Sequence, residues 1–77
     1  MDAREAAAIL EAVGHPPAGI ELRANGYWFG HCSCGYVSAR RRTEAQAVGA
    51  LVHHMIETAK DLVANGVSVP DVRLVTR

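Results

Sequence analysis

Cys32 and Cys34 are the only cysteines of the chain, and one residue separates them. A disulfide across so short a loop would be strained and would constrain little of the unfolded chain. Gly35 follows directly, and glycine is favoured in tight turns. The sequence therefore predicts a sharp turn that carries two free thiols, with the chain on its two sides running antiparallel.

Strand-forming sequence lies on both sides of this turn. Before it, residues 20–23 alternate apolar and polar side chains, Asn25-Gly26 is a strong hairpin signal, and three aromatic residues follow at 27–29. After it, residues 36–40 have the composition of a returning strand. These segments predict a three-stranded antiparallel meander.

Two helices are expected around the meander. Apolar residues recur every three or four positions from Asp2 to Val13, and Gly14 supplies a C-terminal stop. A capping box of Thr43 and Gln46 opens a second helix that runs to Ala64. Its core-facing stripe is expected to comprise Val48, Val52, Met55, Ile56, Ala59 and Val63, with Leu51 and Leu62 on the flank.

The fold class that follows is α+β, in one small domain over residues 1–77. Its parts are an N-terminal helix in 1–14, a unit of hairpin, cysteine turn and packing helix over 20–65, and a C-terminal strand or arm over 66–77. The element order is α-β-β-β-α-β, and its centre is a ββα unit. Residues 15–19 contain two prolines and form a stiff connector.

So small a domain has little core. A chain of this length buries roughly 60% of its unfolded surface, and burial barely offsets the entropy of ordering. Thirteen of the apolar residues are alanines, which bury little area each, and only four residues are aromatic. The fold therefore needs a further stabilising element, and a bound metal or a homodimer interface would supply one.

The two thiols point to a metal. Two thiolates on a turn and an imidazole on the following helix form a tetrahedral zinc site in small ββα units. The 18 residues between Cys34 and His53 leave room for a strand, a turn and part of a helix. We expect Cys32, Cys34 and either His53 or His54 to bind zinc, since adjacent helical residues point about 100° apart.

The fourth ligand is open at this point. His31, Glu57, His15 and a water molecule are the candidates, and we rank the histidine pair and His31 above the others. The alternative is that both cysteines are free and half-buried without a metal.

The segment from Tyr27 to about His54 resembles small zinc-finger-like proteins of actinobacteria and their phages. The shared pattern is an aromatic residue before C-x-C-G-[WY], a polar turn, an alanine-rich helix and a histidine. The resemblance implies zinc on Cys32, Cys34 and one of His53 or His54, and it implies no reaction.

Arg40, Arg41 and Arg42 precede the second helix, where phosphate groups bind well. Tyr27 or Trp28 is placed to stack on a base. We take the three arginines and Trp28 as the contact residues for nucleic acid or a host protein. The alternative is a solvated turn.

Taken together, the residues predict a non-catalytic, zinc-stabilised binding module. The resemblance implies a regulatory protein of an actinobacterium or phage. We expect it in the bacterial cytoplasm, with no signal segment, no membrane partner and no small-molecule substrate. No paired carboxylates, nucleophile and base, or phosphate loop indicate an enzyme. The competing hypothesis is a metal-free protein interaction or dimerisation domain, whose helix or terminal strand pairs two copies.

Overall fold

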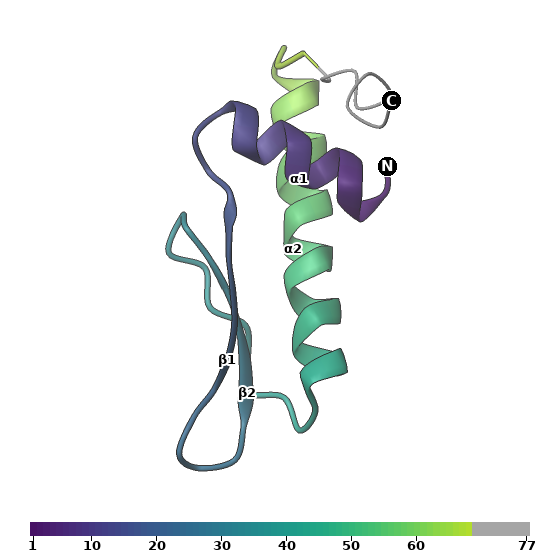
Figure 1. Cartoon of the computed structure of the whole chain (residues 1–77). Helices are drawn as coiled ribbons and strands as arrows, with labels where there is room; N and C mark the ends of the chain where they lie inside the picture. The colour runs from purple at the N-terminus through teal and green to yellow at the C-terminus, as the bar shows by residue number, and fades with distance from the viewer. Residues whose placement is uncertain (69–77) are drawn as a thin grey trace, which may run out of the picture.

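A computed structural model describes residues 1–68 and confirms a small α+β fold. Helix α1 (Ala3–Ala12) is followed by strands β1 (Pro17–Leu22) and β2 (Trp28–Cys32), and then by helix α2 (Glu44–Ala64). The two strands lie along one side of α2, and α1 crosses its C-terminal half (Figure 1). The predicted C-terminal strand or arm falls largely on 69–77, outside the described residues.

Both predicted helices are present, and a side-chain cap begins each of them. The Asp2 carboxylate accepts a hydrogen bond from the Glu5 backbone N–H at 2.8 Å, and the Thr43 hydroxyl accepts one from the Gln46 N–H at 3.2 Å. The Gln46 side chain then accepts from the Arg42 N–H at 3.1 Å, one residue before the partner that a capping box implies. Among residues 1–68, neither helix is both long and apolar enough to cross a membrane.

The end of α1 determines where the following loop begins. Gly14 adopts a left-handed conformation with φ of 75°, which glycine accepts without strain. The Gly14 and His15 backbone N–H groups then donate to the carbonyls of Glu11 and Leu10, at 3.0 and 2.8 Å. This pair of hydrogen bonds is a Schellman motif, and it holds His15 against the last turn of the helix.

The predicted hairpin is confirmed, and its first strand is longer than expected. Strands β1 and β2 pair antiparallel, with Ile20 opposite Gly30 and Glu21 opposite Phe29. The Asn25-Gly26 turn joins them, and the Gly26 N–H donates to the Arg23 carbonyl at 2.9 Å. Strand β1 begins within the connector, because a proline at the start of an edge strand breaks no ladder bond.

The predicted third strand, residues 36–40, is not a continuous strand. This segment meets β2 at two isolated bridges, between Trp28 and Arg41 and between His31 and Val37. The bridges are three residues apart on β2 and four apart on the returning chain, which therefore bulges. At the bulge the Gly30 N–H donates to the Ser38 hydroxyl, at 2.9 Å, in place of a backbone carbonyl.

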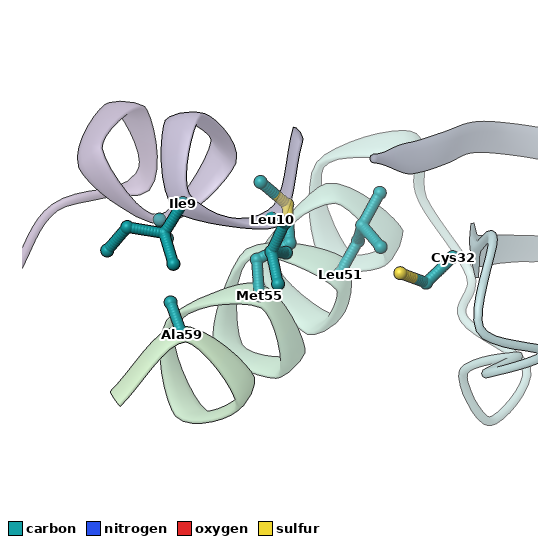
Figure 2. Close-up of a cluster of buried hydrophobic side chains, with 7 residues drawn as sticks. Ile9, Leu10, Cys32, Leu51, Met55 and Ala59 are labelled. Carbon is teal, nitrogen blue, oxygen red and sulfur yellow. The ribbon is translucent and has the colours of Figure 1, made fainter. Parts of the chain in front are cut away.

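The core lies between α1, α2 and the end of β2 (Figure 2). Its buried members are Ala6, Ile9, Leu10, Cys32, Leu51, Met55 and Ala59. The buried stripe of α2 is thus Ala47, Leu51, Met55 and Ala59, rotated from the predicted stripe, and Val48 is exposed. The reason is close approach: a Cβ on Gly30 would lie 3.0 Å from both the Ala47 carbonyl oxygen and the Leu51 Cβ.

Candidate metal centre

Four side chains of metal-binding type converge where the loop after α1, the cysteine turn and helix α2 meet. Their ligand atoms all lie within 4.8 Å of one another. His15 comes from the loop between α1 and β1, Cys32 from the end of β2, Cys34 from the following turn, and His54 from α2. Among residues 1–68, these four form the only such group of three or more. The group can hold a metal ion.

The cysteine turn has the sharp geometry that the sequence predicts. The Gly35 N–H donates to the Cys32 carbonyl at 3.1 Å, and the Cys32 N–H donates to the Tyr36 carbonyl at 3.0 Å. Gly35 takes a positive φ of 97°, which closes the turn without a Cβ clash. The Ser33 N–H donates to the Pro16 carbonyl at 3.4 Å, so the turn is joined to the loop that carries His15.

The distances within the cluster fit one tetrahedral ion. Nε2 of His15 lies 3.0 Å from Sγ of Cys32, and Nε2 of His54 lies 3.5 Å from Sγ of Cys34. With bonds of about 2.3 Å to sulfur and 2.0–2.1 Å to nitrogen, the ligand atoms of a tetrahedral zinc are roughly 3.3–3.8 Å apart. Around a bound ion the 3.0 Å pair would lengthen, and the pairs that lie farther apart, up to 4.8 Å, would contract into this range.

Burial shifts the pKa of two of the four candidate ligands. It lowers the pKa of His54, and the neighbouring charge of His15 lowers that pKa further, which favours the neutral imidazole that binds metal. Burial also raises the pKa of the Cys32 thiol, since a thiolate is poorly solvated beside Leu51 and Met55. A divalent cation would supply the charge that this thiolate requires.

Tyr36 fixes the orientation of the His54 ring. The two rings stack with centroids 3.9 Å apart and planes 4° from parallel. Tyr36 is itself half-buried against the core and follows the cysteine turn directly. The residue that ends the turn therefore also positions the candidate ligand on α2, which is a reason for an aromatic side chain at this position.

Three other candidate ligands from the sequence lie away from the cluster. His53 is exposed, because one helical step turns it away from the core stripe. The His31 Nε2 is 2.8 Å from a Glu21 carboxylate oxygen, on the outer face of the sheet. Glu57 is exposed and faces Lys60, with 3.9 Å between their charged atoms. None of the three belongs to the group that contains His54.

The predicted contact residues lie at the other end of the sheet. Trp28 and Arg41 exchange two backbone hydrogen bonds, of 2.8 and 2.9 Å. The Arg40 guanidinium lies 5.0 Å from the centre of the Tyr27 ring, and Arg42 stands just before the cap of α2. These side chains are therefore separate from the metal cluster.

We compared the chain with protein-family models, with curated proteins and with solved structures, and none of them matches it. The site is therefore interpreted from its own geometry.

The adjacent histidines provide a matched pair of variants. His54→Ala is expected to lose zinc, whereas His53→Ala should keep it. Of these two neighbouring histidines, only His54 lies within ligand distance of the thiols. Changes that merely disturb the support of a ligand cost roughly 10–100-fold in metal affinity, and removal of the ligand itself should exceed this. Competition with a chromophoric chelator measures the affinity of each variant. Equal zinc affinity in the two variants would contradict the assignment.

Proposed function

We propose that this chain is a non-catalytic binding module whose fold is held together by one structural zinc ion. The observation that carries the proposal is the convergence of His15, Cys32, Cys34 and His54 from three separate segments. Two cysteines and two histidines are a common ligand set for structural zinc.

Ligand chemistry supports zinc as the metal of this proposal. Thiolates are soft ligands that discriminate against magnesium and calcium, and imidazole with thiolate in a tetrahedral arrangement suits zinc. The resemblance to small zinc-finger-like proteins implies Cys32, Cys34 and one of His53 or His54, and of these two histidines His54 is the one near the thiols. His15 lies outside the segment that this resemblance covers, and its proximity to Cys32 adds it to the set.

The number of candidate ligands supports a non-catalytic role. Catalytic zinc sites have three protein ligands and leave one position for water or substrate. Here four protein side chains lie around one point, so an ion bound to all of them has no open position. The ion would instead connect the α1 loop, the cysteine turn and α2, which a small core holds only weakly.

Native mass spectrometry before and after chelation tests this function. We expect one zinc per chain, and loss of the folded charge-state distribution when the metal is removed, since metal binding energy is part of folding energy. The same spectrum gives the number of subunits. A metal-free mass with an unchanged fold would overturn the proposal and favour the metal-free interaction domain.

A further inference from the structure

The outer face of the sheet carries a set of side chains that the metal centre does not use. Gly30 and Cys32 face α2, so strand alternation places Tyr27, Phe29 and His31 on the opposite face. Among residues 1–68, helices α1 and α2 lie on the same side of the sheet, and neither helix covers this outer face (Figure 1). Tyr27 and Phe29 are only half-buried there.

Arginine side chains lie over these two aromatic rings. The Arg23 guanidinium is 4.0 Å from the centre of the Phe29 ring, and Arg40 is 5.0 Å from the centre of the Tyr27 ring. Arg23 is also held by the Glu21 carboxylate at 2.9 Å. The two exposed cations therefore lie over the rings, across the outer face of the sheet. We call Arg23, Tyr27, Phe29 and Arg40 the aromatic platform.

The zero net charge of the chain conceals an uneven distribution of charge. Four arginines, at positions 23, 40, 41 and 42, lie within residues 19–46, together with only two glutamates. The other described residues reverse this balance, with Asp2, Glu5, Glu11, Glu57 and Asp61 against Arg4 and Lys60. Positive charge is thus concentrated in the segment that carries the platform, and negative charge on the parts of the two helices beyond it.

We propose that the aromatic platform binds single-stranded nucleic acid. Unpaired bases would stack on Tyr27 and Phe29 in place of the guanidinium groups, so that Arg23 and Arg40 contact phosphates, as in proteins that combine a basic surface with stacking side chains. Arg41 and Arg42 add positive charge at the same end of the sheet. A duplex keeps its bases stacked inside and gives the rings nothing to contact. This inference deepens the proposed binding function and rests on it, because it names the partner of the module.

Trp28 is not part of the aromatic platform, although it is among the contact residues expected from the sequence. Trp28 shares the strand face of Gly30, toward α2, and Phe29 takes its place among the outward aromatic side chains. The metal centre and the platform are therefore on different parts of β2, the first at its C-terminal end and the second at its start. Zinc binding and nucleic-acid binding can be measured independently.

Fluorescence anisotropy with the zinc-loaded chain tests the proposal. The probes are a labelled oligothymidylate of about 12 nucleotides, the matching oligouridylate, and a duplex of equal length, since stacking sites span roughly 4–16 nucleotides. We expect both single strands to bind more tightly than the duplex. Replacing Arg40, Arg41 and Arg42 with glutamine should reduce the slope of log affinity against log salt by roughly 0.7 for each phosphate that the protein no longer neutralises.

Two aromatic variants distinguish stacking from simple charge attraction. Phe29→Leu and Tyr27→Leu keep an apolar strand residue but remove the ring, and each should weaken binding roughly tenfold. Arg4→Gln, on the distant helix α1, is the control and should leave affinity unchanged. Binding that is unaffected by Phe29→Leu and Tyr27→Leu, or tighter binding of the duplex, would overturn the proposal.

Metal content measured on the same samples keeps the two proposals apart. A chain that holds one zinc and is folded but binds neither single strand would refute the nucleic-acid partner alone and leave the zinc module intact. A folded chain without zinc that binds single strands through Phe29 would refute the zinc module and support the partner.

Discussion

Cys34→Ser is expected to release zinc and leave most of the chain unfolded at room temperature. Structural zinc contributes roughly 10–16 kcal/mol of apparent binding free energy at neutral pH, which exceeds the total stability of about 5–15 kcal/mol of many domains. Cys34 is exposed, so its replacement removes a ligand without opening a hole in the core. Far-ultraviolet circular dichroism and zinc content, measured together, follow the expected unfolding.

Cys32→Ser should have at least as large an effect, for two reasons. Cys32 is a ligand of the proposed ion, and it is also 5% exposed within the core cluster. A serine hydroxyl at this position would be buried, with His15 as its neighbouring hydrogen-bond partner, and would cost about 1–3 kcal/mol where that bond is not made. Comparison of the two cysteine variants therefore separates the contribution of the metal from that of the core.

Ser33→Ala is the control for both variants. Ser33 stands between the cysteines and is exposed. Its backbone N–H, which donates to the Pro16 carbonyl, is retained in alanine. We expect the free energy of unfolding to change by less than about 0.5 kcal/mol. If Cys34→Ser were as stable as Ser33→Ala, the fold would not depend on a metal.

Local sequence signals predicted the helices and the hairpin, and the reasons are physical. The Asp2 and Thr43 caps and the spacing of apolar residues act within a few positions of the chain, so they can be read without knowing the tertiary fold. The Asn25-Gly26 turn is equally local. The third strand fails because the Ser38 side chain replaces a ladder bond, a substitution that composition does not reveal.

The choice between the two histidines depended on tertiary contacts. The predicted stripe of α2 was centred near Val52 and Ile56, whereas close packing against Gly30 rotates the buried side to Leu51 and Met55. His54 lies about 60° from Leu51 around the helix, while His53 lies about 160° away. Because Gly30 has no Cβ, α2 packs closely against it, and this packing decides which histidine faces the thiols.

His15 is the residue that sequence reasoning ranked too low. It lies in a loop with no periodicity, so no pattern predicts the direction of its side chain. One signal was available in the sequence: Gly14 ends α1, and a Schellman motif there holds the next residue against the helix. Combined with docking of α1 on α2, this places the imidazole 3.0 Å from the Cys32 sulfur.

The second large effect is expected from Leu10→Ala, in the helix that precedes His15. Leu10 is fully buried between α1 and α2, near Met55 and Leu51 (Figure 2). Truncation of such a leucine costs about 2–5 kcal/mol, because burial is reduced and a cavity is left behind. Urea titration of the zinc-saturated chain should show a lower midpoint with an unchanged m-value.

The same substitution should weaken zinc binding, although Leu10 is not a ligand. The Leu10 carbonyl accepts the His15 N–H at 2.8 Å, so a loosened α1 also loosens the loop that presents the imidazole. If the metal-free chain is unfolded, every decrease in folding free energy also weakens the apparent zinc affinity. A decrease of about 3 kcal/mol would then weaken zinc binding roughly hundredfold.

Glu11→Ala tests whether this coupling comes from the core rather than from helix α1 in general. Glu11 is the next residue on the same helix, is exposed, and should change stability and zinc affinity only slightly. A Leu10→Ala chain with reduced stability but unchanged zinc affinity would show that the metal-free chain is already folded. The core, rather than the ion, would then position His15 beside the cysteine turn, and the zinc would be bound by a preformed site.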